Sequence, residues 1–136
     1  MKIIIRIFGL SIMLFYVIII FLQMMSYNVR RDELNRCISV AMTNTQIVMM
    51  ENIEDKMYGT SNSRKQIISN DDYLEEFAHN FYMLISTNTN YEIRVYAIDY
   101  TVGLLSVEVE GSFYTLNGIK KTFSSRKTSF VDVLKE

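Results

Sequence analysis

The chain contains few side chains of the types that carry out chemistry. Its 136 residues include one cysteine and one histidine, and no proline or tryptophan. A single cysteine cannot close a disulfide within the chain or build a thiolate zinc site, and a single histidine cannot build a multi-histidine metal site. The composition therefore predicts no metal site and no bound cofactor.

Cys37 is a candidate for covalent modification, and it lies in a stretch with helical patterning. It could be acylated if it faces the cytoplasm, or could form an intermolecular disulfide if it faces the outside of the cell. A lone cysteine on a helix is more often a small packed residue, so packing is the favoured interpretation and an intermolecular thiol is the functional alternative. His79 has no second ligand or nucleophile beside it in the sequence, which predicts a surface position.

The acidic and hydroxyl residues form no catalytic pattern either. Two pairs of glutamates could serve acid–base catalysis: Glu75 with Glu76, and Glu108 with Glu110. Both pairs fit the solvated faces of amphipathic elements better, and the second pair could instead bind Arg94 or Arg126 across strands. The segment at residues 124–127 lacks the G-x-S-x-G spacing of a nucleophile elbow, and the sequence has no phosphate-binding loop. We predict that the chain is not an enzyme.

The charge balance excludes one class of partner. Fourteen Lys and Arg residues against 15 Asp and Glu residues give a net charge of −1. General binding to nucleic acid needs an excess of basic side chains that neutralise phosphates. No nucleic-acid partner is therefore expected.

An apolar segment predicts a transmembrane helix. Residues 7–25 read IFGLSIMLFYVIIIFLQMM, carry no charge, and include 12 Ile, Leu, Val or Phe residues. As a helix they span roughly 30 Å, the thickness of a bilayer hydrocarbon core. At about −0.3 to −0.6 kcal/mol each, these side chains contribute roughly −4 to −7 kcal/mol to insertion. Residues 1–6, which include Lys2 and Arg6, form a basic N-terminal flank.

A cleaved secretory signal is the alternative to a retained anchor. The apolar region of such a signal is normally about 7–15 residues long and is followed by small residues. The segment here is longer and is followed by QMMSYN, so we expect it to be retained. Basic residues flank both ends, with Arg30, Arg31 and Arg36 on the far side, and the positive-inside rule is nearly balanced. The favoured orientation is an N-in, C-out signal anchor in the cell membrane, with an extracytoplasmic C-terminal domain.

Residues 26–57 predict an amphipathic helix that continues from the membrane. They contain no Pro or Gly, and a kink at residues 26–28 is the alternative to a single continuous helix. Apolar residues recur at spacings of three and four, which marks one face. Four residues of this face are the candidates for assembly with another helix: Leu34, Ile38, Met42 and Met49.

A loop over residues 58–70 is expected to separate this helix from a second one over residues 71–86. Asn70, Asp71 and Asp72 supply capping oxygens for the second helix. Its apolar stripe includes Phe77 and Phe81, which we expect to pack on a sheet.

Residues 91–133 predict a three-stranded antiparallel meander. The first strand should direct four residues to the core: Tyr91, Ile93, Val95 and Ala97. A turn at residues 99–103 leads to a second strand, whose core residues are expected to be Leu105, Val107, Val109 and Phe113. Asn117-Gly118 predicts a two-residue type I′ turn, and the third strand covers residues 120–133. Residues 71–136 thus combine a helix and a sheet, and the fold class is α+β.

The layout resembles that of type IV pilins, pseudopilins and the TadE-like pilus proteins of Gram-positive bacteria. The resemblance rests on the apolar helix, its amphipathic continuation and the meander, and on the segments RRDELNRCISVAM, DDYLEEF, EIRVYAIDYTVGLLSVEVEG and SSRKTSF. It implies a small bitopic membrane protein. Prepilin processing in that family uses a Gly followed five residues later by Glu, whereas the fifth residue after Gly9 is Leu14.

Two functions of different classes are consistent with these features. The first is a structural or accessory subunit of a pilus-like (Tad or type IV) or secretion assembly. Its partners would be the lipid bilayer and other membrane or pilus-assembly subunits, bound through the N-terminal helix. A second copy of this chain is one such partner, which would give a homo-oligomer. The second is a membrane-tethered module that captures a ligand or a partner peptide.

Overall fold

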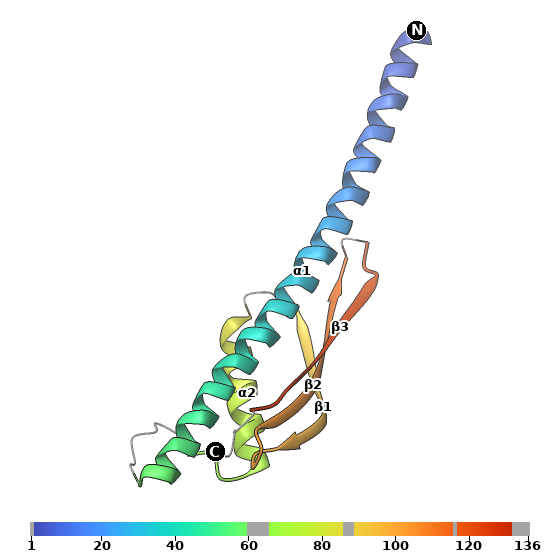
Figure 1. Ribbon diagram of the computed structural model, residues 1–136. Helices are drawn as coiled ribbons and strands as arrows, with labels where there is room; N and C mark the ends of the chain where they lie inside the picture. Colours follow the sequence, from blue (N-terminus) through green and yellow to red (C-terminus); the bar gives the residue numbers. More distant parts are fainter. Residues whose placement is uncertain (1, 60–65, 86–88, 116, 132–136) are drawn as a thin grey trace.

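The computed structural model describes residues 2–59, 66–85, 89–115 and 117–131. These residues form, in chain order, α1 (Lys2–Tyr58), α2 (Asn70–Leu84), β1 (Asn90–Asp99), β2 (Leu104–Tyr114) and β3 (Lys120–Ser129). The N-terminal half of α1 projects alone, and the other elements pack beside its C-terminal half (Figure 1). The predicted α+β fold class is confirmed.

α1 is one helix of 57 residues, and it is not interrupted at residues 26–28, where a kink was the alternative. The helix contains no proline, so every backbone N–H beyond its first turn can bond to the carbonyl four residues earlier. Hydroxyl side chains are satisfied in the same way: Ser11 donates to the carbonyl oxygen of Ile7 at 3.0 Å, and Thr45 to that of Ala41 at 2.7 Å. Ser11 therefore needs no water, which suits its place in an apolar segment.

α2 is capped by Ser69 rather than by Asn70. The Ser69 hydroxyl accepts a hydrogen bond from the N–H of Asp72 at 3.1 Å, and the Asp72 carboxylate accepts hydrogen bonds from the Ser69 hydroxyl and the Ile68 N–H. This reciprocal arrangement is similar to a capping box, except that the backbone N–H bound by Asp72 belongs to Ile68, the residue before the cap. Asn70 instead accepts a hydrogen bond from the N–H of Tyr100 at 2.9 Å, which ties the start of α2 to the β1–β2 turn. The prediction that Asn70 caps the helix is wrong, because the cap lies one residue earlier.

Parts of three predicted segments lie outside the described residues. They are residues 60–65 of the loop predicted over 58–70, residue 86 at the predicted end of the second helix, and residues 132 and 133 of the third strand. β3 itself ends at Ser129, before the predicted end of that strand.

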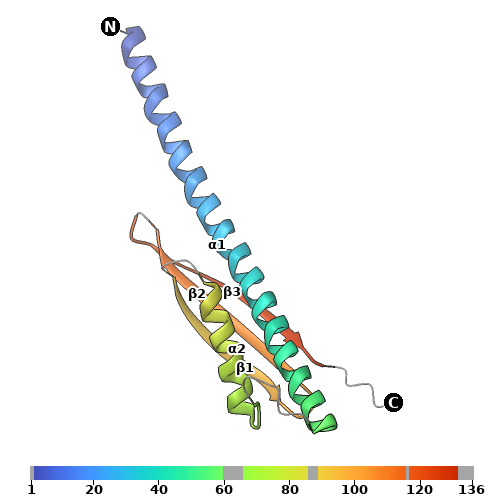
Figure 2. The ribbon, with the colours of Figure 1, turned by 90° about the vertical axis from the view of Figure 1, so that its left-hand side faces the viewer.

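The three strands form an antiparallel meander in the order β1-β2-β3. Both helices lie on the same side of this sheet: α1 contacts β2 and β3, α2 contacts β1, and the helices contact each other. Figure 2 shows the two helices side by side across the sheet. The core fills the space between the helical layer and the inward face of the sheet, and Phe77 and Phe81 of α2 are fully buried in it. The predicted packing of the second helix on the sheet is confirmed.

β1 departs from the predicted alternation at Tyr96, an extra residue in a β-bulge between Val95 and Ala97. Beyond a bulge the inward and outward rows exchange. Ile98 therefore lies opposite Leu105 in the inward row, and Ala97 lies in the outward row. The prediction that Ala97 faces the core is wrong, because a strict two-residue period cannot anticipate an inserted residue. Val95, the last residue before the bulge, is 39% exposed, so the prediction that it is a core residue is also wrong.

β2 has the predicted inward row, whose four apolar residues are all buried. Gly111 belongs to the same row and lies opposite Phe123 of β3 and Tyr91 of β1. The ring of Phe123 lies against Gly111, since a Cβ added there would be 2.5 Å from its Cζ atom. The glycine thus leaves room for an aromatic ring on the inward face of the sheet.

The β2–β3 turn is not the predicted two-residue type I′ turn. Gly118 has a φ of +74°, whereas Asn117 does not have a positive φ. The N–H of Gly118 donates to the carbonyl of Thr115 at 2.9 Å, and the N–H of Thr115 donates to the carbonyl of Ile119 at 2.9 Å. This pattern is that of a three-residue hairpin loop with glycine in the left-handed position. The Asn-Gly signal located the turn correctly but did not fix its length.

One glutamate that was expected on a solvated face is buried. Glu76 of α2 is 9% exposed and accepts a hydrogen bond from the Asn80 amide at 3.0 Å. The same amide donates to the Thr45 hydroxyl of α1 at 3.3 Å, so these polar groups bridge the two helices. The solvated interpretation of Glu76 is wrong, because α1 packs along that side of α2.

Candidate functional site

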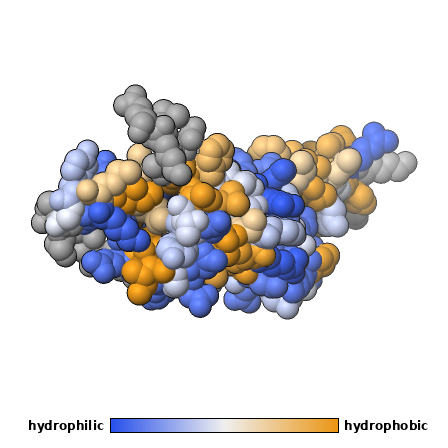
Figure 3. Space-filling view, turned by 60° about the horizontal axis from the view of Figure 1, so that its bottom comes forward, coloured by the Kyte–Doolittle hydropathy of each residue, from blue (hydrophilic) through white to orange (hydrophobic). Residues whose placement is uncertain are grey.

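The apolar part of α1 is the most unusual surface of the molecule. Within the described residues, one helix is long and apolar enough to cross a membrane, and none of its most apolar window is buried. Most large apolar side chains from Ile3 to Val29 are exposed, the exceptions being the partly buried Ile19 and Tyr27, and Tyr16, at the midpoint of residues 7–25, is 67% exposed. Figure 3 shows apolar residues over much of the helix where it extends beyond the domain. A core helix of a water-soluble domain would instead be covered on its apolar face.

We call the junction between this exposed helix and the domain the neck. It comprises residues 22–33 of α1 together with residues 113–115 and 119–124 of the β2–β3 hairpin. Tyr27 of α1 packs edge-on against Phe123 of β3, with 6.1 Å between ring centroids. The Arg30 guanidinium lies 4.7 Å from the centre of the Phe113 ring and donates to the Thr89 hydroxyl at 2.5 Å. These contacts fix the hairpin against α1.

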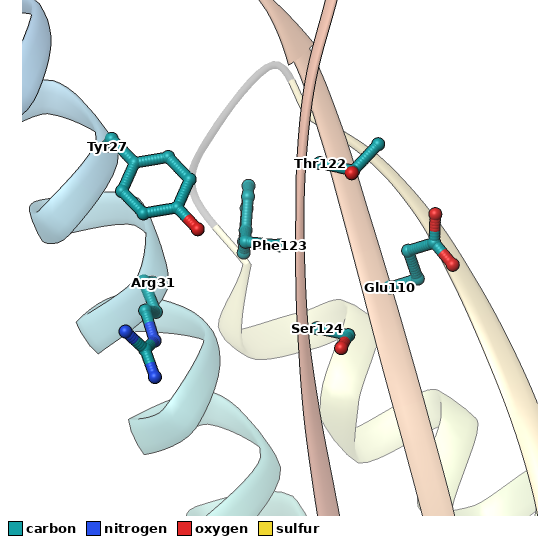
Figure 4. Close-up of a pocket in the computed structure, with 6 residues that line it drawn as sticks. All are labelled: Tyr27, Arg31, Glu110, Thr122, Phe123 and Ser124. Atoms are coloured by element: carbon teal, nitrogen blue, oxygen red, sulfur yellow. The ribbon is translucent and has the colours of Figure 1, made fainter.

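An open hollow of about 430 Å³ lies at the neck beside β3. It is lined by Tyr27, Arg31, Glu110, Thr122, Phe123 and Ser124. Figure 4 shows that the six side chains do not converge: Arg31 points along α1, and Glu110 points away across the sheet. None of the six is a histidine or cysteine, so the lining offers no imidazole base and no thiol nucleophile. The hollow is therefore a polar surface feature whose side chains do not point to a common centre.

Two further hollows surround α1 at the same level. One, of about 300 Å³, lies between the helix and the end of β2 and is lined by Leu22, Gln23, Ser26, Arg30, Phe113, Tyr114 and Thr115. The other, of about 340 Å³, is lined only by α1 residues from Leu22 to Glu33. Gln23 lines the first of these two hollows, and its Nε2 atom is buried without a hydrogen-bond partner among the described residues. The hollows therefore gather where the apolar helix leaves the domain.

The outward face of the sheet carries charges that satisfy one another. Arg94 forms an ion pair with Glu92 of the same strand at 3.0 Å and another with Glu110 of β2 at 3.1 Å. The pair with Glu110 agrees with the predicted cross-strand pairing. The Tyr96 hydroxyl donates to Glu108 at 2.6 Å, and this hydrogen bond lowers the pKa of Glu108 and raises the pKa of Tyr96. Arg126 stacks 4.0 Å above the Tyr96 ring. The glutamates of β2 are thus part of a solvated, paired surface.

The four residues predicted to serve helix assembly lie inside the domain. Leu34, Ile38, Met42 and Met49 are at most 4% exposed, and all belong to the core shared with α2 and the sheet. Because these contacts are made within the chain, the four side chains are not available to a second subunit. The sequence period correctly identified this apolar face of α1, but the face packs against α2 and the sheet of the same chain.

Cys37 is 3% exposed, and its thiol donates to the carbonyl oxygen of Leu84 at 3.5 Å. Burial raises the pKa of Cys37, and the nearby Glu33 carboxylate acts in the same direction while Arg36 opposes it. A buried thiol with a raised pKa is a poor nucleophile. The placement favours the packed interpretation over an intermolecular disulfide. His79 is exposed on α2, as predicted.

The neck residues were not singled out from the sequence. Tyr27 and Arg30 sit between the apolar segment and the amphipathic face, and Tyr114 and Ile119 flank a turn, so none belongs to a periodic pattern. One feature of the sequence was available: large apolar residues stand on both sides of the Asn117-Gly118 turn, with Phe113-Tyr114 before it and Ile119 after it. A group of exposed apolar residues at a turn indicates a surface that interacts with a protein or a membrane.

Comparison of the chain with family models, with curated proteins and with solved structures finds no match. The part of the chain that the structure describes contains no group of three or more His, Cys, Asp or Glu residues placed to hold a metal ion.

Proposed function

We propose that the chain is a non-enzymatic single-pass membrane protein that displays its α+β domain at the bilayer surface. One observation carries this proposal: residues 3–21 of α1 project beyond the rest of the described structure (Figure 1), and their large apolar side chains are exposed except for Ile19, which is partly exposed. A helix satisfies its own backbone groups, and Ser11 satisfies its hydroxyl within the helix, so the segment is suited to lipid. The domain begins directly where this segment ends.

The proposed role is that of a structural or accessory subunit of a pilus-like or secretion assembly. The layout of a membrane helix continued into a small helix-and-sheet domain supports it, as does the TadE-like and pilin-like resemblance of the sequence. Because the apolar face of the C-terminal half of α1 is used within the domain, contacts with other subunits would fall on the exposed part of α1. We place the domain on the extracytoplasmic side, following the signal-anchor architecture.

A membrane-tethered binding module is the second candidate. The polar hollow of about 430 Å³ beside β3 favours it, since a surface of this kind could bind a polar ligand or a partner peptide. In this function the chain would act as a monomer, and the exposed helix would contact only lipid.

Cysteine crosslinking in native membranes separates the two candidates. We would replace Cys37 by Ala and introduce single cysteines in turn at residues 10–20, where the helix is exposed. Asn44→Cys, on the exposed side of α1 within the domain, is the matched control. A subunit that assembles through its membrane helix gives crosslinks at positions three or four residues apart, on one face, together with complexes larger than a monomer on native gels.

The absence of crosslinks at all eleven positions, with a monomer in mild detergent, would contradict the subunit function and favour the tethered module. Recovery of the full chain in the soluble fraction, without any detergent, would contradict both.

A further inference from the structure

The β2–β3 hairpin reaches the level at which the apolar segment of α1 ends. In both ribbon views its tip is the part of the domain that lies furthest toward the N-terminal end of α1 (Figures 1 and 2). Tyr114, at the end of β2, lines a shared hollow with Leu22 and Ser26 of α1. Leu22 and Ser26 bracket the end of the apolar segment at residue 25, so the tip lies beside that end.

The side chains at this tip are apolar and exposed. Tyr114 is 69% exposed and Ile119 is 59% exposed, on opposite sides of the three-residue loop. Both positions would meet water if the domain were held away from a membrane. Tyrosine, with an apolar ring and a polar hydroxyl, is enriched where a bilayer meets water.

Basic residues lie next to these apolar ones. Lys120 is exposed and pairs in register with Tyr114, and Lys121 places its ammonium 5.9 Å from the centre of the Tyr27 ring. Arg31 is exposed on the facing side of α1. An apolar tip followed by cationic side chains matches the order of layers in a bilayer, with acyl chains first and phosphate headgroups next.

We propose that the β2–β3 hairpin tip is a second membrane contact. Tyr114 and Ile119 enter the interfacial layer of the same bilayer that α1 crosses, and Lys120 lies among the lipid phosphates. This inference rests on the proposed membrane anchoring, since only an inserted α1 brings the tip to the bilayer. The domain is then held at two points, α1 and the hairpin, which restricts its tilt relative to the membrane.

The absence of tryptophan from the chain makes a direct test available. We would reconstitute the full chain into vesicles of phosphatidylcholine and anionic phosphatidylglycerol, with and without lipids brominated on the acyl chains, which quench nearby tryptophan fluorescence. Three variants each add one tryptophan in place of an exposed tyrosine: Tyr114→Trp at the tip, Tyr16→Trp at the centre of the apolar segment, and Tyr58→Trp at the far end of α1. Ile119→Trp is a second reporter at the tip.

We expect Tyr16→Trp and Tyr114→Trp to show blue-shifted emission that brominated lipid quenches, and Tyr58→Trp to show the emission of a water-exposed indole without quenching. Quenching of Tyr16→Trp without quenching of Tyr114→Trp or Ile119→Trp would overturn the hairpin contact and leave the anchor intact. A lack of quenching at Tyr16→Trp would overturn the anchor itself, and the hairpin contact with it. Equal quenching at the tip and at Tyr58→Trp would also count against the proposal, because it would reflect general adsorption of the domain.

Discussion

Replacing Gly111 by alanine tests the close packing of the sheet against its aromatic ring. The added methyl group would lie 2.5 Å from Cζ and 2.7 Å from Cε2 of Phe123, and 3.0 Å from Cε1 of Tyr91. Carbon atoms in ordinary contact are about 3.5–4.0 Å apart, so the Phe123 ring would have to move by roughly 1 Å. This position therefore cannot accept even the smallest side chain without rearrangement.

The Phe123 ring has little freedom to make that movement. Edge-to-face contacts hold it on three sides, at centroid distances of 6.1 Å from Tyr27, 6.4 Å from Tyr91 and 6.0 Å from Phe113. Overpacking of a core costs about 1–3 kcal/mol, and each aromatic pair contributes about 0.5–1.5 kcal/mol beyond its buried area. If one aromatic pair is lost with the displacement, the two costs add, and Gly111→Ala lowers the free energy of unfolding by about 1.5–4.5 kcal/mol.

Urea unfolding of the full chain in detergent micelles, followed by near-ultraviolet circular dichroism of the aromatic cluster, measures this loss. Gly9→Ala is the matched control, because nothing lies within 4 Å of a Cβ added at Gly9. Phe123→Leu removes the ring atoms that the methyl group would strike. In that background Gly111→Ala should cost less than about 1 kcal/mol, so the two substitutions are coupled.

An unchanged unfolding midpoint for Gly111→Ala would refute the close approach of the ring. A loss of the same size in the Phe123→Leu background would show instead that the methyl group is harmful for another reason, such as a change in the strand backbone.

Three further predictions concern the anchor, the start of α2 and a buried tyrosine. Leu14→Arg makes insertion less favourable by about 3–4 kcal/mol, a large part of the total, and should increase the fraction of protein released from membranes by carbonate extraction. Ile47→Arg, on the exposed side of α1 within the domain, should leave that fraction unchanged. Ser69→Ala removes the N-cap of α2 and should lower the free energy of unfolding by about 1 kcal/mol in the same urea assay. Burial raises the pKa of Tyr73 to about 12, and its hydroxyl donates to the carbonyl of Gly103 at 3.0 Å. A tyrosine in the unfolded chain ionises near pH 10. The buried Tyr73 hydroxyl therefore contributes fully to the free energy of unfolding below about pH 10, and about 2–3 kcal/mol of this contribution is lost as the pH rises to about 12. Tyr73→Phe should abolish this part of the alkaline destabilisation; an unchanged pH profile would contradict the burial of the ionisable hydroxyl.

Features that depend on one element were readable from the sequence. The long α1, the stripe of α2 with Phe77 and Phe81, and the alternation of β2 each follow from a local period, and the structure confirms them. Features that depend on two elements were not readable. Glu76 is buried only because α1 packs beside α2. The bulge at Tyr96 is defined only by the pairing of β1 with β2, which the sequence of β1 alone does not reveal.

The candidate site illustrates the same limit. The period of α1 correctly identified Leu34 and Ile38 as residues of its apolar face. A period does not identify what packs on that face, however, and here the two residues pack in the core of the domain instead of against a second subunit. The neck combines residues 22–33 with a hairpin almost ninety positions later in the chain, and no local pattern links the two.

The exposed apolar segment and part of the domain core belong to one helix, α1, and this has a mechanical consequence. Leu34 and Ile38 are buried in the core only about ten residues beyond the apolar segment, and α1 has no break between them. A rotation of the apolar segment about its axis must therefore turn the sheet and α2 with it, since the intervening helix is hydrogen-bonded throughout. If the β2–β3 hairpin also enters the lipid interface, such a rotation or tilt would move Tyr114 and Ile119 through the headgroup layer, which opposes the movement. The domain would then hold a fixed orientation relative to the bilayer, and a neighbouring subunit that packs on the exposed face of α1 would always meet the same side of the domain.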